Sequence, residues 1–449
     1  MKKVAVVGAG SAGLFAAYKL AQAGYEVALI DKGKTIEKRK CPSFSSKDCI
    51  HCEPCNTIYG IGGAGLKSDG KLIFHTRTGN NLTELVGEEK NQELVNEVEE
   101  IFKKYGVNAE VPNIEKRSKL MTIASQAGID YVPSKEAHIG SDRLPSVIER
   151  IVNDISGKVE IITEKEADFV HGELVVGAAR YSADKYVLAT GRAGSSWLEK
   201  ITNELSLEYG FNPVDIGVRV EVQKELMDDV CSVSWDLKAR MTTKTYEDPI
   251  RTFCVCPGGY VAREEHNGFC LVNGHSLAEQ KSENTNFAFL VTFKLTEPLE
   301  NGDLYGKEIA RKATFVGGGK PIIQRLGDLR RGRRSTWERI NKYYKPKPTF
   351  LHATPGDIGS ALEYRFVIDV LEGLETLDKL IPGVANDSTL LYCPEIKFHG
   401  IRFKTDNYLQ TNKKGIYVAG DGSGWSRGIV GAACCGLLAA EGIIKNNGG

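Results

Sequence analysis

A glycine-rich turn near the amino terminus constrains the fold more than any other feature of this sequence. Residues 8–13 read Gly-Ala-Gly-Ser-Ala-Gly and directly follow a short, valine-rich run, residues 3–7. Such a run predicts a buried strand of a parallel sheet, and residues 11–23 have apolar side chains at helical spacing. A second apolar run, residues 25–30, predicts the next strand. The sequence therefore predicts a strand–helix–strand unit of the kind that binds a nucleotide.

Each glycine of this turn has a separate task. Gly8 permits the tight turn, Gly10 lets the backbone approach a pyrophosphate, and Gly13 lets the helix pack close to the strand. Ser11 and Ala12 would begin the helix, whose free N–H groups and positive end then face the phosphates.

Asp31 and Lys32 follow the second predicted strand. A carboxylate at this place can accept hydrogen bonds from ribose hydroxyls, and it would repel a 2′-phosphate. The sequence therefore disfavours NADP as the ligand. A glycine-rich turn without a ligand is the alternative, and the combination of strand, helix, glycine spacing and Asp31 argues against it.

Two segments far along the chain extend the pattern. The first ends a predicted strand with Ala189, Thr190, Gly191 and Arg192. The second ends a predicted strand with Gly420 and Asp421, ahead of a predicted helix.

These segments resemble the Ala-Thr-Gly and Gly-Asp motifs of the two-dinucleotide-binding, glutathione-reductase-like flavoproteins, in the same order along the chain. The resemblance implies an α/β fold with a Rossmann-like parallel sheet that binds FAD, and a second, β-rich (α+β) substrate domain. It implies that Asp421 holds the ribityl chain and that Asp31 holds the adenosine ribose. It also implies that Ala167, next to Glu166, lies beside the adenine.

A resemblance to a poorly characterised family of FAD-dependent dehydrogenases covers nearly the whole chain. The matching segments are residues 52–55, 62–72, 138–142, 256–259 and 420–421. This resemblance implies an FAD-dependent oxidoreductase that transfers a hydride between a small-molecule substrate and flavin N5, and it implies no particular substrate. A further run of glycines, residues 317–319, does not follow a predicted strand, so we expect no separate NAD(P)H domain.

Two segments are expected beside the flavin ring. The first contains Gly63, Ala64, Gly65, Ser68, Asp69, Gly70 and Lys71. Glycines allow a backbone to approach a flat ligand closely, and Lys71 would lie near flavin N1 or pair with Asp69. The second begins a predicted helix with Gly428, Ile429 and Val430. The positive end of that helix would stabilise negative charge on reduced flavin, and Arg427 either adds to it or is a solvated surface side chain.

Four of the 11 cysteines gather in one short segment: Cys41, Cys49, Cys52 and Cys55. Closely spaced thiolates resemble the ligands of an iron–sulfur cluster such as 4Fe–4S, and four cysteines can also close a zinc site. A redox pair of Cys52 and Cys55 is a third interpretation, and free thiols are the fourth. An iron–sulfur cluster near the flavin would make the protein an electron-transfer flavoprotein with a redox partner protein, which is an alternative function.

The sequence assigns no catalytic residue. The side chains expected to approach a substrate are His138, His275, His399, Tyr392 and Glu395. Histidines at such positions are more often structural than acid–base groups. Cys256 and the adjacent Cys434 and Cys435 are interpreted as packing residues.

A basic stretch, residues 325–347, interleaves arginines and lysines with aromatic residues. RNA binding by such a stretch would suit a tRNA-modifying flavoenzyme, which is a further alternative. Lys and Arg together number 58, as do Asp and Glu, so the formal net charge is zero. Nucleic-acid-binding proteins usually carry a basic excess, so we expect a solvated helix and loop here and no nucleic-acid partner.

The length of 449 residues predicts two domains. We expect an FAD domain of residues 1–80, 130–215 and 395–449, a helical insertion of residues 81–129, and a substrate domain of residues 216–394. Further helices are predicted over residues 83–105, 114–128 and 142–155, the last capped by Asp142. No stretch is expected to be apolar over the length that spans a bilayer, and no signal-peptide pattern is present, so we expect a cytoplasmic protein with no membrane partner.

Overall fold

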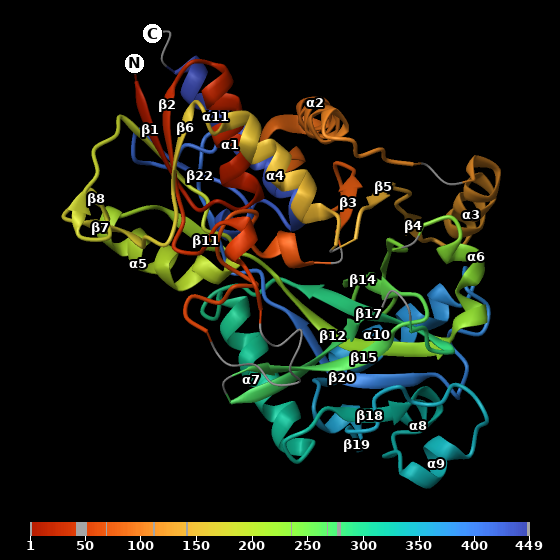
Figure 1. Ribbon diagram of the computed structural model, residues 1–449. Helices are drawn as coiled ribbons and strands as arrows, with labels where there is room; N and C mark the ends of the chain where they lie inside the picture. Colours follow the sequence, from red (N-terminus) through yellow and green to blue (C-terminus); the bar gives the residue numbers. More distant parts are fainter. Residues whose placement is uncertain are drawn as a thin grey trace. The chain divides into compact units, whose positions relative to one another are not determined.

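The computed structural model describes residues 2–41, 52–68, 70–110, 113–140, 142–234, 236–266, 268–275 and 280–446. The chain forms two compact units (Figure 1). Unit 1 consists of Met1–Val111, Ser134–Gly210 and Gly400–Gly449. Unit 2 consists of Pro112–Pro133 and Phe211–His399.

Unit 1 is built on a five-stranded sheet of order β22-β10-β1-β2-β6, whose neighbouring strands are all parallel. Its strands are β1 (Lys3–Val7), β2 (Glu26–Ile30), β6 (Val159–Ile162), β10 (Lys185–Leu188) and β22 (Ile416–Val418). In register, Val7 of β1 lies beside Ile30 of β2 and Leu188 of β10. Because the strands are parallel, their carboxyl ends meet at one edge of the sheet, where open α/β sheets bind ligands.

Both faces of this sheet are covered, which explains its nearly continuous apolar strands. On one face, Val4, Val6, Val27 and Leu29 share a core with α1 (Ser11–Gln22), α2 (Thr83–Lys104), α4 (Leu144–Ile155) and α11 (Gly428–Lys445). On the other face, Ala5, Val7, Ala28 and Ile30 pack against α5 (Ser195–Leu205), β7 (Ala167–Val170) and β8 (Glu173–Val176). The short strand β9 (Ala179–Arg180) pairs with β8, and β3 (Lys71–Phe74) pairs with β5 (Lys135–His138). The α/β fold class expected from the sequence is thus confirmed.

The start of α4 differs from its prediction. The helix begins at Leu144 with Arg143 as its N-cap residue, and no side-chain hydrogen bond caps it, so the expected cap by Asp142 is wrong. A proline in the first turn favours this start, because its fixed φ suits the first helical positions and it needs no hydrogen-bond acceptor there.

The last helix, α11, also departs from expectation. It is long and apolar enough to cross a membrane by length and composition, and 72% of its apolar window is buried inside the protein. Its side chains from Ile429 to Ile443 belong to the core of unit 1. Its apolar sequence is therefore explained by packing on both sides within that core.

Unit 2 is built on an eight-stranded sheet of order β19-β18-β20-β12-β17-β14-β13-β4. Neighbouring strands are antiparallel except β18 and β19. The strands are β4 (Asp130–Tyr131), β12 (Val214–Gln223), β13 (Ala239–Thr242), β14 (Pro249–Cys256), β17 (Asn284–Phe293), β18 (Ile322–Arg325), β19 (Thr354–Pro355) and β20 (Leu390–Lys397). A separate hairpin joins β15 (Tyr260–His266) to β16 (Phe269–His275).

The two faces of this sheet differ in character because side chains alternate along each strand. Along β12, the valines and Ile216 enter a core with α3 (Ile114–Gln126), α7 (Gly302–Val316) and α10 (Tyr364–Leu377). Among the alternate residues of β12, Asp215, Arg219 and Glu221 are buried polar side chains. Unit 2 therefore carries a network of buried charges on the other face of its sheet.

The expected helical insertion, residues 81–129, is divided between the units: α2 lies in unit 1 and α3 in unit 2.

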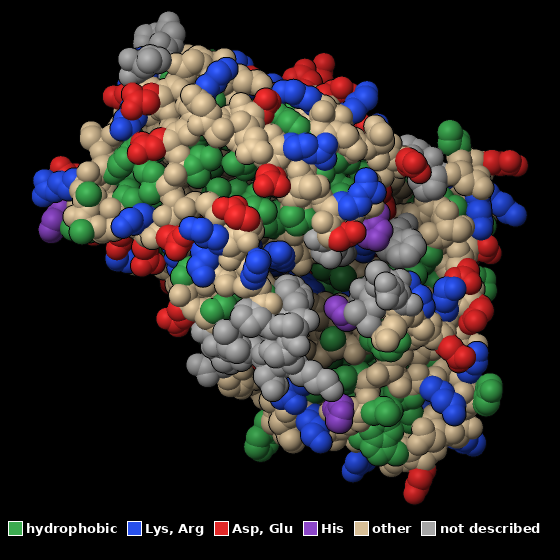
Figure 2. All heavy atoms as spheres, in the orientation of Figure 1, with side chains coloured by type: hydrophobic (Ala, Val, Ile, Leu, Met, Phe, Trp, Pro, Cys, Tyr) green, Lys and Arg blue, Asp and Glu red, His purple; other side chains and the backbone are tan. Residues whose placement is uncertain are grey.

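The glycines at 317–319 follow helix α7, and the N–H of Gly317 caps it by donating to Ala313 O at 2.9 Å. Basic and acidic side chains are interspersed over the face seen in Figure 2, as the zero net charge leads one to expect.

Candidate functional site

The glycine turn of unit 1 has the geometry that its sequence predicts. Gly8 has φ +103°, and a Cβ there would lie 2.3 Å from Ala189 O. A Cβ on Gly13 would lie 1.8 Å from Gly8 O, so only glycine lets the helix start this close to the strand. At Gly10, in contrast, the nearest atom to an added Cβ is Gly63 Cα at 3.8 Å. Gly10 therefore faces open space ahead of the N-terminus of α1.

Asp31, directly after β2, accepts hydrogen bonds from three backbone N–H groups. Its Oδ2 accepts from Ala9 N at 2.8 Å, and its Oδ1 accepts from Gly33 N at 2.7 Å and Gly60 N at 2.8 Å. The carboxylate thus ties the glycine turn to two following loops. A carboxylate has about four acceptor positions, so capacity for a ribose hydroxyl remains.

A cavity of about 70 Å³ opens at this edge of the sheet in unit 1. It is lined by Val7, Gly8, Ile30, Asp31, Lys32, Tyr59, Lys165, Glu166, Ala167, Thr190, Gly194 and Trp197. The cavity brings together predicted site residues from four separate segments: the turn, the end of β2, the start of β7 and the end of β10. Ala167 and Glu166 lie at the wall with Asp31, and the adenine that the resemblance implies beside them stays a prediction.

Two polar atoms of the residues that line this cavity have no hydrogen-bond partner within the described chain: Thr190 Oγ1 and Trp197 Nε1. Buried polar groups without partners are rare in proteins. Together with the open space at Gly10 and the remaining acceptor capacity of Asp31, they fit a nucleotide at this edge.

A second cluster forms where β22 ends. Asp421 Oδ1 accepts from Ser426 Oγ at 3.1 Å, and Oδ2 accepts from Gly428 N at 3.2 Å, the first residue of α11. Arg192 Nε lies 3.7 Å from Asp421 Oδ2 and is largely exposed. Arg427 donates from Nη1 to Ser426 O at 2.7 Å, so its guanidinium binds backbone carbonyls near the start of α11. Asp421 therefore holds the beginning of α11 in place.

The glycine segment after Tyr59 packs against the turn. Gly62 N donates to Ala9 O at 2.8 Å, and a Cβ on Gly63 would lie 2.9 Å from Gly10 Cα. A Cβ on Gly65 would lie 2.9 Å from a side-chain carbon of Ile429 in α11. The segment thus bridges the N-terminal ends of α1 and α11 within unit 1, which is where the sequence places the flavin.

The rest of this segment is partly described. Ser68 Oγ donates to Gly65 O at 2.7 Å, and a Cβ on Gly70 would lie 2.6 Å from Gly140 O. Lys71 begins β3, opposite His138 of β5. Asp69 lies outside the described residues, and the expected pairing of Lys71 with it stays a prediction.

Of the four clustered cysteines, Cys41, Cys52 and Cys55 are described and Cys49 is not. Among the described residues, no group of three or more His, Cys, Asp or Glu side chains is placed to hold a metal ion. The iron–sulfur and zinc interpretations therefore stay predictions. Burial opposes ionisation of Cys55, but hydrogen bonds from the Thr57 hydroxyl at 3.0 Å and from backbone N–H groups lower its pKa.

Sequence reasoning missed several residues that build this region. Arg39 is 1% exposed and donates to the carbonyls of Asn56, Thr57 and Ile61, which holds the loop that leads into the glycine segment. Burial lowers its pKa to about 10. Tyr59 and Trp197 line the cavity, with Lys32 Nζ 4.3 Å from the Tyr59 ring centroid. None of these residues belongs to a local motif, so only the fold brings them to the site.

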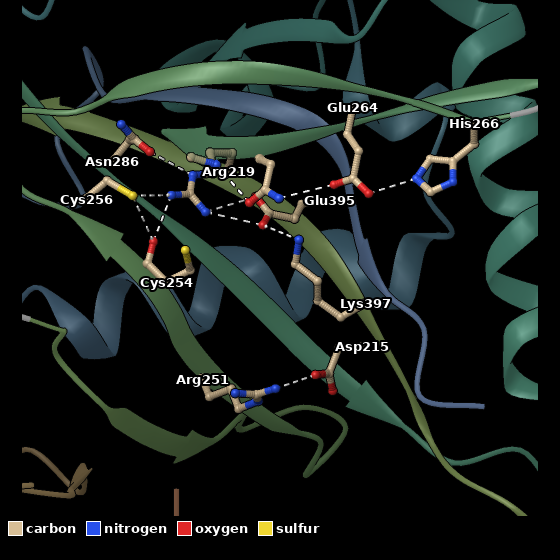
Figure 3. A network of polar contacts seen from close by, with 12 residues as sticks. Asp215, Arg219, Arg251, Cys254, Cys256, Glu264, His266, Asn286, Glu395 and Lys397 are labelled. Carbon is tan, nitrogen blue, oxygen red and sulfur yellow. Dashed lines mark hydrogen bonds and ion pairs between the residues drawn. The ribbon is translucent and has the colours of Figure 1, made fainter. Parts of the chain in front are cut away.

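The residues proposed to approach a substrate from unit 2 lie in polar networks. Tyr392 is completely buried and donates to Glu221 Oε2 at 2.7 Å, while Glu395 is completely buried and pairs with Arg219 at 3.3 Å (Figure 3). His399 Nε2 lies 2.9 Å from Asp215 Oδ2. His275 ends β16, and His138 ends β5 in unit 1 and lines a separate cavity of about 220 Å³.

Several arginines of the basic stretch, residues 325–347, pair with carboxylates. Arg330 and Arg331 pair with Asp387 at 3.1 and 2.8 Å, and Arg333 pairs with Asp328 at 2.9 Å. Arg325 is buried, and its guanidinium carbon lies 3.9 Å from the Tyr343 ring centroid. These charges thus hold the short helices α8 (Leu326–Arg330) and α9 (Trp337–Asn341) to their surroundings in unit 2.

Comparison with known proteins agrees with this architecture. The family model described as pyridine nucleotide-disulphide oxidoreductase matches residues 2–264. A model described as FAD-dependent protein, C-terminal domain-like, matches residues 213–397. An uncharacterized protein of Clostridium beijerinckii is 27% identical over 478 aligned residues, which cover 98% of this chain and 80% of the relative.

Similar solved structures include L-proline dehydrogenase from P. horikoshii, with a TM-score of 0.41, 12% identity and coverage of 99% of this chain and 94% of that one. Glycine oxidase from Bacillus cereus gives a TM-score of 0.37 and 12% identity, covering 100% and 96% of the two chains. The family match spans more than half of the chain and includes the turn, the cavity and the Ala-Thr-Gly segment. The chain belongs to the pyridine nucleotide-disulphide oxidoreductase family and is an FAD-dependent oxidoreductase.

Proposed function

We propose that the protein binds FAD along the carboxyl edge of the unit 1 sheet and is a dehydrogenase of a small-molecule substrate. When bound, FAD supplies a hydride acceptor at flavin N5. The observation that carries this proposal is the convergence of the glycine turn, Asp31 and Asp421 at the ends of β1, β2 and β22.

The strand order supports an extended ligand. Asp31 follows β2 and Asp421 follows β22, and these strands are three positions apart in the order β22-β10-β1-β2. At the usual spacing of neighbouring strands the two carboxylates follow strands about 14 Å apart, with the glycine turn between them. That arrangement suits a dinucleotide whose two sugar-like ends are held by the carboxylates and whose phosphates lie between.

The residues of unit 1 would divide the work as follows. The free N–H groups at the start of α1 bind the phosphates, and Gly10 leaves room for them. The start of α11, held by Asp421, directs its positive end toward negative charge on the reduced ring. Gly63 and Gly65 permit the backbone to lie against a flat ring. These residues would bind FAD and orient its ring.

Replacement of Gly10 by alanine tests the phosphate position. The added methyl has only Gly63 Cα within 4 Å, at 3.8 Å, so the apoprotein should fold normally. We expect FAD affinity to fall at least about tenfold because the methyl occupies the phosphate space, a loss of about 1.4 kcal/mol. Flavin fluorescence titration of FAD-stripped protein measures the affinity.

The matched control is Gly157→Ala, whose added methyl has no atom within 4 Å. It should bind FAD as the parent protein does. Unchanged affinity in the Gly10 variant would show that the phosphates lie elsewhere, and FAD-stripped parent protein that takes up no FAD would overturn the proposed function itself.

A further inference from the structure

A pair of cysteines ends strand β14 of unit 2. Cys254 and Cys256 are separated by one residue and are both thiols in this structure. The pairing of β14 with β17 shifts between Phe253 and Cys256, which marks a β-bulge, and Cys254 has φ +48°. A non-glycine residue in this left-handed conformation is uncommon and costs about 1 kcal/mol or more, so the surrounding structure holds it there.

The guanidinium of Arg219 lies against this pair (Figure 3). Arg219 is 0% exposed, and its Nη2 donates to Cys254 O at 2.8 Å and approaches Cys256 Sγ at 3.4 Å. Its Nε donates to Asn286 Oδ1 at 2.8 Å. A Cβ on Gly274 of β16 would lie 1.7 Å from Nη2, so the hairpin backbone packs directly on the guanidinium.

Among the described residues, the charges that meet beside this pair are those of Arg219, Glu395 and Lys397. Glu395 is the carboxylate in contact with Arg219, at 3.3 Å, and it also pairs with Lys397 at 3.1 Å. Two cations thus share one buried carboxylate, while Asn286 is neutral. The other carboxylates drawn in Figure 3 have partners of their own: Asp215 pairs with Arg251, and Glu264 pairs with His266 and Asn273. Excess positive charge in a buried place favours the anionic form of a neighbouring thiol.

The ionisation of Arg219 points the same way. Burial would lower its pKa, but Glu395 and the side chains of Cys254 and Cys256 outweigh that effect and raise the pKa above its ordinary value. The guanidinium therefore remains charged beside both thiols.

We propose that Cys256, whose thiol lies 3.6 Å from Cys254 O and whose thiolate form Arg219 would stabilise, and Cys254 form a dithiol that a small hydroperoxide oxidises to a reversible intrachain disulfide. Cys256 is 5% exposed, so the reagent must be small. Two residues of extended strand span about 6.6 Å, near the upper limit for disulfide-linked Cα atoms, and a bulge shortens that span.

The reaction balances as two steps. The Cys256 thiolate attacks the terminal O–H oxygen of the hydroperoxide, the O–O bond breaks, an alkoxide leaves (hydroxide in the case of hydrogen peroxide), and the sulfur becomes a sulfenic acid. The Cys254 sulfur then attacks the Cys256 sulfur, the S–O bond breaks, and the Cys254 proton leaves with the oxygen as water. The two cysteines lose two electrons, and the peroxide gains them. External thiol reverses the change by exchange.

Trypsin isolates this pair from the other cysteines. Cleavage after Arg251 and Arg263 yields residues 252–263, which contain Cys254 and Cys256 and no other cysteine. Cleavage after Arg427 and Lys445 yields residues 428–445, which contain the buried pair Cys434 and Cys435. Burial raises the pKa of both control thiols, that of Cys435 to about 12, so this second peptide is a matched control.

The experiment treats oxidised, FAD-loaded protein without substrate with hydrogen peroxide, then denatures and alkylates it before mass spectrometry. We expect the peptide of residues 252–263 to escape alkylation and to have a mass two hydrogens below that of its unalkylated dithiol form. Its oxidation should be at least about tenfold faster than any oxidation of the peptide of residues 428–445. Dithiothreitol should restore full alkylation. Equal rates for the two peptides, or sulfinic acid without disulfide, would overturn the proposal.

Two serine variants assign the roles of the two cysteines. In Cys254→Ser, dimedone should label Cys256 after peroxide treatment, because the sulfenic acid has no second thiol to attack it. In Cys256→Ser, Cys254 should stay unlabelled under the same conditions. Labelling of Cys254 in the second variant would show that Arg219 does not select Cys256.

Discussion

At the scale of single residues, Asp369 of α10 shows how burial sets a response to pH. Its side chain is completely buried, and its Oδ1 accepts from Thr243 Oγ1 at 2.7 Å. Burial, aided by the nearby carboxylate of Asp248, raises the pKa of Asp369 to about 6. The folded state thus prefers the protonated acid, and its stabilising contribution is complete below the ordinary aspartate pKa and lost as pH rises through about 6.

Replacement of Asp369 by asparagine removes this ionisation. The amide keeps an acceptor for Thr243, so we expect the variant to be more stable than the parent by about 3 kcal/mol at pH 8, since the pKa rises from 3.8 to about 6 and each pKa unit is worth about 1.4 kcal/mol. The gain should vanish only below about pH 3, where the parent acid is protonated in both the folded and the unfolded state. Urea unfolding at the two pH values measures the difference, and a gain independent of pH would contradict the assigned cause.

Single residues also show what a sequence can and cannot reveal. The roles of Gly8, Gly10 and Gly13 can be predicted from their spacing in the sequence. Gly10 leaves space for a ligand, while Gly8 and Gly13 permit close contacts of the backbone. The left-handed conformation of Cys254 and the position of Trp197 at the cavity of the unit 1 sheet depend on segments distant in sequence. No local pattern encodes such contacts, so they required the structure.

At the scale of elements, the close contact of α1 with α11 makes a sharp prediction. A Cβ on Gly436 of α11 would lie 2.0 Å from Ala12 O and 3.0 Å from Ala16 N. Gly436→Ala should push the two helices apart and cost about 2 kcal/mol of unfolding free energy. Denaturant unfolding of this variant beside Gly157→Ala, which has open space, provides the measurement. Similar stability of the two variants would mean that the helices can separate without cost.

The elements of unit 1 are predictable from sequence because each carries its own periodic pattern: β1, α1 and β2 lie within a residue or so of their expected bounds. The start of α4 is less predictable, since a proline outweighs the cap expected from Asp142. The sheet of unit 2 resists prediction because β12 pairs with β17 and β20, which are distant in sequence. Such pairing depends on chain topology and not on local propensity.

At the scale of the whole molecule, FAD should stabilise one unit selectively. A ligand at about 100 times its Kd stabilises the state that binds it by about 2.7 kcal/mol. Because the proposed contacts lie in unit 1, hydrogen exchange of α1 and α11 should slow up to about 100-fold with FAD, while β17 and α10 of unit 2 change little. Mass spectrometry of the exchanged peptides measures both units in one sample. Equal slowing of hydrogen exchange in both units would show that FAD does not bind to unit 1 alone.

The order of segments in unit 1 has a consequence for how the protein is made. Its sheet begins with β1 but is completed by β22, and Asp421 and α11 come after the whole of unit 2 in the chain. A ribosome therefore releases the first half of the flavin site long before the second half. A nascent or prematurely terminated chain carries the glycine turn without the carboxylate and helix that complete the site. We therefore expect FAD capture only once synthesis has passed α11, and chains that stop before β22 should remain colourless.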